Sequence, residues 1–180
     1  MTKKKSTGFT LIELLLVVVL IGVLSGVVLS VVNVAGIRAR SRDAQRAGEL
    51  KRIQTALELY FSDFRGYPEN AGGWLTVVAS GTDVLNSALM GSYIQTLPQD
   101  PRNGEAMAAN QCGQSNFGYY YKTDACGSSG CLAARYVITT FMESESAAES
   151  GICSNLVNCS SGSVAGCNCA IPCYGVENPL

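Results

Sequence analysis

The chain has no histidine, one tryptophan and five prolines among its 180 residues. Without imidazole it lacks the commonest general base and the commonest nitrogen ligand of metal ions. It also contains no Gly-x-Ser-x-Gly elbow, no phosphate-binding loop and no pair of acids in a recognisable catalytic pattern. These absences argue against the usual hydrolases and nucleotide-dependent enzymes, so the sequence predicts a protein that is not an enzyme.

Charge is absent from nineteen consecutive residues, Leu14 to Val32. A helix of that length measures about 28 Å, close to the thickness of the hydrocarbon core of a bilayer. An acid, Glu13, stands at the start of this run, and a carboxylate inside a membrane is costly without a partner. A secretory signal has a shorter apolar region and does not begin with an acid. We therefore predict a transmembrane helix over residues 9–32 in which Glu13 has a specific role.

The residues before this run carry a motif. Gly8-Phe9-Thr10-Leu11-Ile12-Glu13 follows a short leader that contains three lysines, Lys3 to Lys5. This arrangement resembles the type III leader of type IV pilins and type II secretion pseudopilins. The resemblance implies that residues 1–8 are a leader peptide, that a prepilin peptidase cuts between Gly8 and Phe9, and that Phe9 is then N-methylated.

The resemblance also implies a role for Glu13. In a packed bundle of such helices, the carboxylate of one subunit can neutralise the new N-terminal amine of Phe9 on a neighbouring subunit. Two unpaired buried charges are costly, whereas a buried pair is tolerated and fixes the register between helices. The implied partners are other copies of the subunit in a homopolymer, the prepilin peptidase, an inner-membrane assembly platform and, before assembly, the membrane.

Basic residues lie on both sides of the apolar run. Lys3 to Lys5 precede it, and Arg38, Arg40, Arg42 and Arg46 follow it, so the count of lysines and arginines does not settle orientation. The resemblance and the cysteines discussed below favour a cytoplasmic N-terminus. The expected location is the inner membrane as a single-pass precursor, and then an extracellular filament at the cell surface.

Charge is unevenly distributed along the chain. Residues 38–65 hold seven basic and four acidic side chains, and residues 66–180 hold three basic and nine acidic ones. Loss of the three leader lysines would lower the net charge from −1 to −4. The basic stretch is suited to anionic lipid headgroups or to acidic heads of neighbouring subunits. The acidic remainder argues against non-specific affinity for nucleic acid, and no specific nucleic-acid partner is predicted.

The cysteines indicate an oxidising compartment. All eight follow residue 110, namely Cys112, Cys126, Cys131, Cys153, Cys159, Cys167, Cys169 and Cys173. An even number in a Gly- and Ser-rich tail without histidine predicts disulfides in an exported domain, rather than a zinc or copper site at Cys167 to Cys173. A Cys126–Cys131 bond is favoured, because it would close the tip of a hairpin; the other pairings stay open.

The pattern of the remaining chain predicts an α+β fold. Leu50, Ile53, Leu57, Tyr60 and Phe64 recur at helical spacing, so the helix begun at residue 9 is expected to continue as an amphipathic half, residues 33–65, that packs on a sheet. Gly66 is the expected residue after the helix end. Residues 66–116 form an αβ-loop, with a turn or helix at Trp74–Ala79 and a helix at Asp83–Met90 capped by Thr82 or Asp83.

Residues 117–180 are expected to form an antiparallel β-sheet head with a Cys-rich, loop-like tail. Residues 117–123 and 132–142 read as two strands of a hairpin, with Phe117, Tyr119 and Tyr121 on one face. The second strand carries apolar residues on both faces, one of which covers the helix while the other meets a neighbour or lies at the surface. Glu143, Glu145 and Glu149 cluster after it, where major pseudopilins bind calcium; no cofactor is predicted, because the matching spacing is absent and a solvated acidic turn is the favoured interpretation.

The leading functional prediction is the pilin subunit of a type IV pilus, a filament that supports adhesion, twitching motility or DNA uptake. One alternative is a type II secretion pseudopilin in a periplasmic piston, which the turn Leu97-Pro-Gln-Asp-Pro101 favours, because it resembles a turn of major pseudopilins. A second alternative is a minor pilin that binds a surface through its Cys-rich tail.

Overall fold

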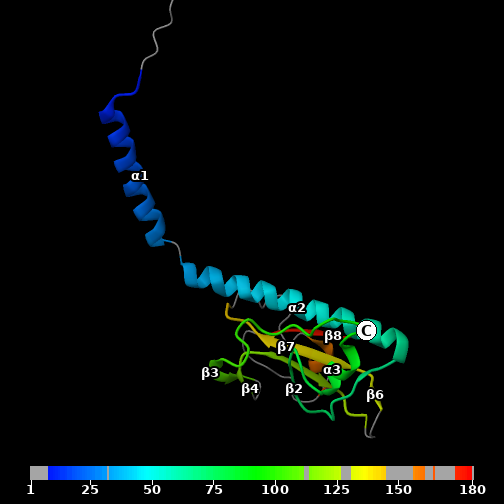
Figure 1. The fold of residues 1–180 in the computed structure, drawn as a ribbon. Helices are drawn as coiled ribbons and strands as arrows, with labels where there is room; N and C mark the ends of the chain where they lie inside the picture. The colour runs from blue at the N-terminus through cyan, green and yellow to red at the C-terminus, as the bar shows by residue number, and fades with distance from the viewer. Residues whose placement is uncertain are drawn as a thin grey trace, which may run out of the picture. The chain divides into compact units, whose positions relative to one another are not determined.

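The computed structural model describes residues 8–31, 33–111, 114–126, 131–144, 156–160, 164 and 173–179 (Figure 1). The chain divides into two compact units, residues 1–37 and 38–180. The first holds helix α1 (Leu11–Val31), and the second combines most of helix α2 (Val34–Phe64) with antiparallel strands. The α+β class predicted from the sequence is confirmed.

The predicted continuous helix over residues 9–65 is wrong at Asn33. The side-chain Oδ1 of Asn33 accepts a hydrogen bond from the Gly36 N–H at 3.0 Å, and its carbonyl accepts one from Ile37 at 3.1 Å. Asn33 is therefore the N-cap of α2, a position that asparagine favours because its short side chain satisfies a free N–H of the first turn. The predicted membrane span over residues 9–32 is not found either: among the described residues, no helix is both long and apolar enough to cross a bilayer.

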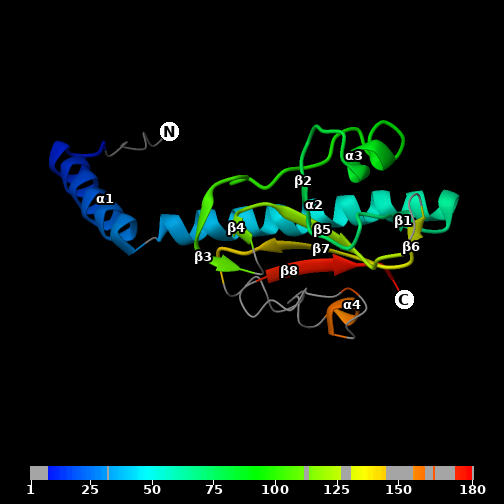
Figure 2. The same ribbon diagram turned by 90° about the horizontal axis from the view of Figure 1, so that it is seen from below.

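The head is built on a four-stranded antiparallel sheet. Its order is β2 (Leu75–Val77), β5 (Tyr119–Thr123), β7 (Tyr136–Phe141) and β8 (Cys173–Glu177), as Figure 2 shows. Tyr121 of β5 lies opposite Ile138 of β7, which confirms the predicted antiparallel pairing. The second strand begins only at Tyr136, because Leu132 and Ala133 pair with Tyr67 and Pro68 instead. Trp74–Ala79 was expected to be a turn or helix, but it contains β2, because Leu75, Thr76 and Val77 pair with three residues of β5 in antiparallel register.

Two smaller sheets and two short helices complete the described elements. The strand β1 (Tyr67–Pro68) pairs with β6 (Leu132–Ala133), and β3 (Ala106–Gln111) pairs with β4 (Gln114–Asn116). Helix α3 (Val84–Leu89) begins at Asp83, whose carboxylate accepts from the N–H groups of Leu85 and Asn86 at 3.0 Å. Asp83 is one of the two caps that the sequence predicted. Helix α4 (Val157–Ser160) belongs to the tail.

The main core lies between α2 and one face of the sheet. Leu50, Ile53 and Leu57 are completely buried against it, as the helical spacing predicted. The sheet contributes four residues of β5 and β7: Tyr119, Tyr121, Tyr136 and Ile138. Phe64 departs from the prediction, since it is 53% exposed and stacks on Tyr60 at a centroid distance of 4.5 Å.

The other face of the sheet is also covered. Val137 and Phe141 are buried, and the tail residues Leu156 and Val164 pack in the same cluster as Val137. Phe117 packs with Phe141 on this side rather than with Tyr119, because β5 begins only at Tyr119 and the strand alternation does not extend back to residue 117. The tail therefore buries the sheet face that was expected to meet a neighbour or lie at the surface.

The end of α2 differs from the predicted glycine signal. Arg65, not Gly66, adopts the left-handed conformation after the last helical residue, with φ of 60°. Gly66 is required for space instead: a Cβ there would lie 2.4 Å from the Cβ of Leu132 on β6. The glycine thus allows β6 to approach the end of the helix closely.

Candidate functional site

The predicted assembly segment begins with a helix cap. Thr10 precedes α1, and its backbone N–H and hydroxyl both donate to Oε2 of Glu13, at 2.8 and 2.7 Å. In return, the Glu13 N–H donates to the Thr10 hydroxyl at 3.4 Å. This reciprocal pattern is a capping box, and the spacing Thr-x-x-Glu is the sequence signal that indicates it. The two residues of the predicted cleavage site, Gly8 and Phe9, are exposed and precede the helix.

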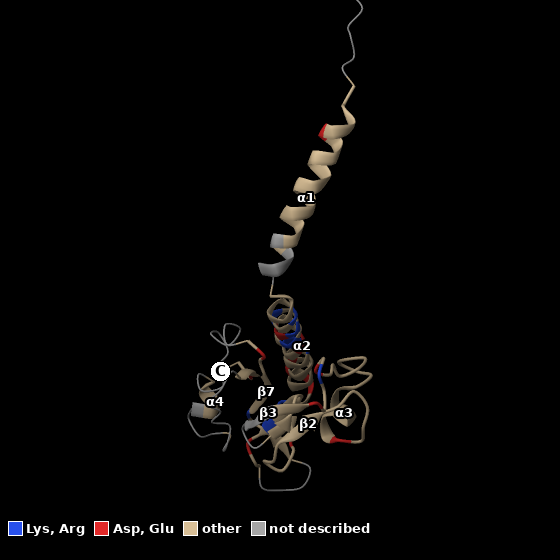
Figure 3. Cartoon of the chain, turned by 90° about the vertical axis from the view of Figure 1, so that its left-hand side faces the viewer, with Lys and Arg blue, Asp and Glu red and all other residues tan. Residues whose placement is uncertain are grey.

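The apolar side chains of α1 are exposed in a single chain. Phe9 is 89% exposed, and the large apolar residues from Leu11 to Leu24 are all at least 50% exposed. Glu13 is the only charged residue of α1, and Figure 3 draws this helix almost entirely in the colour of uncharged residues, with an acidic position near its start. Burying apolar surface of this kind is worth about 25 cal/mol per Å², so this helix has a strong drive to associate with apolar partners.

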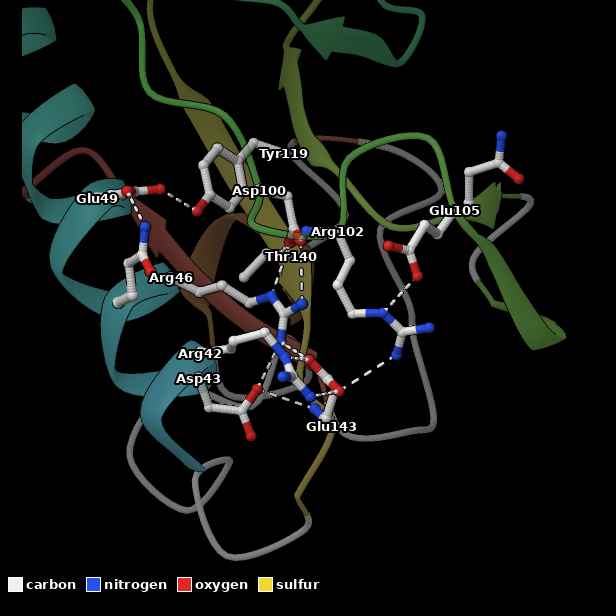
Figure 4. A network of polar contacts seen from close by, with 12 residues as sticks. Arg42, Asp43, Arg46, Glu49, Asp100, Arg102, Glu105, Tyr119, Thr140 and Glu143 are labelled. Carbon is white, nitrogen blue, oxygen red and sulfur yellow. Dashed lines mark hydrogen bonds and ion pairs between the residues drawn. The ribbon is translucent and has the colours of Figure 1, made fainter. Parts of the chain in front are cut away.

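The head contains a buried network of charges centred on Arg46 of α2 (Figure 4). Its Nε and Nη2 donate to Asp100 at 2.7 and 3.0 Å. Its Nη1 donates to Asp43 at 2.8 Å and to Glu143 at 2.9 Å. Asp100 belongs to the Leu97–Pro101 turn and Glu143 follows β7, so one guanidinium joins three separate parts of the chain.

Glu143 connects Arg46 with two further arginines. Arg42 donates to its carboxylate at 2.7 and 2.5 Å, and Arg102 donates at 3.2 Å. Hydrogen bonding from Arg42, and then from Arg46, lowers the pKa of Glu143 to about 2 against an opposing effect of burial. The carboxylate is therefore ionised at neutral pH and is fully engaged by cations of its own chain.

Asp43 fixes the first residues of the tail. Its carboxylate accepts from the N–H groups of Glu143 and Ser144, both at 2.9 Å, and from the Ser144 hydroxyl at 2.6 Å. An aspartate that is satisfied by several donors anchors the peptide that supplies them. The point where the tail leaves the sheet is thus attached to α2.

An aromatic ring and two tyrosine–acid pairs add to the contacts between α2 and the rest of the head. Phe117 lies beside two guanidiniums, 4.3 Å from Arg102 and 5.2 Å from Arg46. Further along α2, Glu49 accepts from the Tyr119 hydroxyl, and Glu58 accepts from Tyr136 at 3.0 Å. Burial raises the pKa of Tyr119 and of Tyr136, so both tyrosines remain protonated donors. These pairs fix the position of α2 on the sheet.

The network revises two sequence-based expectations. Arg42 and Arg46 were grouped with the basic residues available to outside partners, yet both are engaged internally. Glu143 was expected in a solvated acidic turn and was considered for calcium, but its oxygens already bind three arginines. Glu145 and Glu149 lie outside the described residues.

The described cysteines are consistent with an oxidised domain. The predicted Cys126–Cys131 bond is present, and Cys159 and Cys173 are also disulfide-bonded. Cys112, Cys153, Cys167 and Cys169 lie outside the described residues. Glu69 lies with Cys126 and Cys131 in a group whose ligand atoms are within 4.8 Å of one another, but two sulfurs joined in a disulfide are not thiolate ligands for a metal.

Comparisons with known proteins place these features in a family. Residues 3–29 match the prokaryotic N-terminal methylation motif, and residues 33–121 match type II secretion system protein G. The type II secretion system core protein G of Aeromonas hydrophila is 32% identical over 103 residues, 56% of this chain and 71% of that protein. The core protein G of Klebsiella pneumoniae is 32% identical over 54% of this chain and 70% of its own length. No solved structure matches.

These relatives favour the pseudopilin alternative over the pilus filament, which was the leading prediction from the sequence. The match to the methylation motif agrees with the leader-peptide resemblance. The buried network extends beyond the matched region, since Glu143 lies after residue 121. The chain belongs to the protein G family of the type II secretion system, among the pilin-like proteins with an N-terminal methylation motif.

Proposed function

We propose that this protein is a structural subunit of the pseudopilus of a type II secretion system. The observation that carries the proposal is the exposed apolar helix α1, which lies within a match to the N-terminal methylation motif in a chain that belongs to the protein G family. A helix with so much uncovered apolar surface needs either lipid or other helices around it. A fibre of such subunits buries this surface between neighbouring copies.

In this proposal, the precursor is held at the inner membrane until a prepilin peptidase removes residues 1–8 and methylates Phe9. The new amine of Phe9 is cationic at neutral pH. The Glu13 carboxylate of a neighbouring subunit then neutralises it as the helices pack, with the assembly platform as a further partner. The head, closed by its ion network and disulfides, forms the outer part of a periplasmic fibre.

Glu13→Gln provides the sharpest test, because glutamine can still accept the capping bonds of Thr10 while it lacks the charge. The variant and the wild type are expressed in the host without its own copy of the gene. Secretion of an enzyme that depends on the type II system is measured in the medium, and subunit crosslinking is measured in the envelope. We expect processing to continue and both crosslinked oligomers and secretion to be lost.

Thr10→Ser is the matched control, because serine preserves the capping box, and it should secrete normally. Normal assembly of Glu13→Gln would contradict the pairing role. The pilus alternative predicts a different outcome, in which deletion of the gene abolishes long surface filaments and leaves secretion intact.

A further inference from the structure

The last turns of α2 carry an exposed aromatic side chain that the core does not bury. Phe64 is 53% exposed, and its ring stacks on Tyr60 at a centroid distance of 4.5 Å. Tyr93 packs edge-on against Tyr60 at 5.7 Å, and its hydroxyl donates to Asp63 at 2.7 Å. These contacts fix Phe64 and Asp63 at the surface. We call the four residues Tyr60, Asp63, Phe64 and Tyr93 the aromatic knob.

Asp63 gives the aromatic knob a negative charge that its own chain leaves uncompensated. The carboxylate accepts hydrogen bonds from the hydroxyls of Tyr93 and Ser62, at 2.7 and 3.3 Å, and both donors are neutral. Within the described ranges of the chain, no lysine or arginine forms an ion pair with it. The knob therefore presents an apolar ring beside a carboxylate, and its complement is an apolar hollow beside a cation.

The head contains a groove of this complementary kind between α2 and the edge strand β8. The groove has a volume of about 350 Å³. Lys51 and Gln54 of α2, Tyr174 and Val176 of β8, and Leu156 of the tail contribute to its lining. Lys51 is exposed, and its Nζ donates to the neutral Oε1 of Gln54 at 3.4 Å. Lys51 forms no ion pair among the residues that the structure describes, so its charge is available to a partner.

The knob and the groove lie on opposite sides of the same helix. Successive residues of an α-helix are rotated by about 100°, so Tyr60 projects about 180° away from Lys51. Figure 2 shows the same division, with α3 on one side of α2 and β8 on the other. Both surfaces belong to the compact unit of residues 38–180. About 18 Å of helix separates Lys51 from Asp63 along the axis.

Complementary surfaces on opposite sides of one chain can join copies head to tail, and a contact of this type extends into an open fibre. We propose that the aromatic knob of one subunit occupies the groove of the next, with Phe64 beside Tyr174 and Asp63 paired with Lys51. The occupant is a second copy, because one chain supplies both an apolar ring for an apolar hollow and a carboxylate for an ammonium group. The proposal rests on the fibre assembly of the proposed function.

The test uses the full chain with the photocrosslinker p-benzoylphenylalanine in place of Phe64, in host cells without their own copy of the gene. Irradiation of the envelope should give dimers, and mass spectrometry of the dimers should place the crosslink within residues 173–179 of the second copy. The same photocrosslinker in place of Leu59 is the control. Leu59 is 50% exposed but is rotated by about 140° from Phe64, so its crosslinks should not reach those residues.

Charge substitutions test the pair of Asp63 and Lys51 in the same assay. Lys51→Asp should lower the yield of these dimers about tenfold, because it places two carboxylates against each other across the interface. Adding Asp63→Lys reverses both charges and should restore the yield. Arg52→Asp is the matched control, because it makes the same change of charge at an exposed residue that projects about 100° away from Lys51. It should leave the yield unchanged.

Dimers whose crosslinks lie outside residues 173–179 would overturn the proposal, as would crosslinks to other proteins alone or an equal loss of yield in Arg52→Asp. A double variant K51D/D63K that stays as low as Lys51→Asp would overturn the charge pairing. The Glu13→Gln experiment is separate, because it measures helix pairing and secretion. Assembly that depends on Glu13 without the crosslink from Phe64 to β8 would refute this contact and leave the proposed function standing. The crosslink in cells whose secretion does not need the gene would support the contact and contradict the proposed function.

Discussion

Replacing Arg46 with methionine should destabilise the head more than any other single change in its ion network. The methionine occupies a similar volume, but it leaves Asp43 and Asp100 without a cation, and both of these side chains are fully buried. Removing one member of a buried ion pair costs about 3–5 kcal/mol, because the remaining charge is desolvated and unpaired. Domains of this kind are stable by about 5–15 kcal/mol, so a large part of the total would be lost.

Urea unfolding in a mild non-ionic detergent measures this loss. Trp74, the single tryptophan, packs against the cluster of Val137 and reports unfolding of the head by its fluorescence. Arg42→Met is the control, because Arg42 is 32% exposed and its loss should cost about 1 kcal/mol. Adding Asp100→Asn to Arg46→Met removes one unpaired charge and should restore part of the stability. A loss below about 1 kcal/mol in Arg46→Met would refute the reasoning.

Three further predictions concern the head and α2. The pKa of Glu143 is lowered to about 2, so its contribution to stability is complete above the unfolded pKa near 4.5 and falls as the pH drops toward 2. Urea titrations across that pH range measure the change, which should be absent from Glu143→Gln. Arg65→Gly should stabilise the head by about 0.5–1 kcal/mol in thermal unfolding, because φ is 60° there, and destabilisation would contradict the left-handed assignment. Asn33→Ala should cost about 1 kcal/mol of helix stability, seen as faster amide exchange in the first turn of α2, and unchanged exchange would argue against the cap.

Local signals in the sequence predicted local structure well. The Asp83 cap of α3 and the buried spacing of Leu50, Ile53 and Leu57 depend on neighbouring residues, and both are present. The helix boundary at Asn33 was not predicted, because asparagine carries no charge and the uncharged stretch continues through it. Its side chain nevertheless caps the following helix. The pilin and pseudopilin class could also be predicted from the sequence, because the residues of the leader motif are contiguous.

The ion network depends on distant residues and could not be predicted. Arg46 lies 54 residues from Asp100 and 97 from Glu143, and neither spacing carries a periodic signal. The arginines therefore looked like a basic stretch beside the apolar run, and Glu143 looked like part of an acidic turn. Only the packing of three segments shows that these opposite charges neutralise each other inside the head.

The covered outer face of the sheet has a practical consequence for studying the tail. Leu156 and Val164 are buried beside Val137, and the tail also supplies the edge strand β8. A chain truncated after Met142 would lose that strand and would expose Val137 to water, so its failure to assemble or secrete would reveal little about recognition. Substitutions of exposed tail side chains that leave Leu156, Val164 and β8 in place would test binding by the tail separately from its role in stabilising the head.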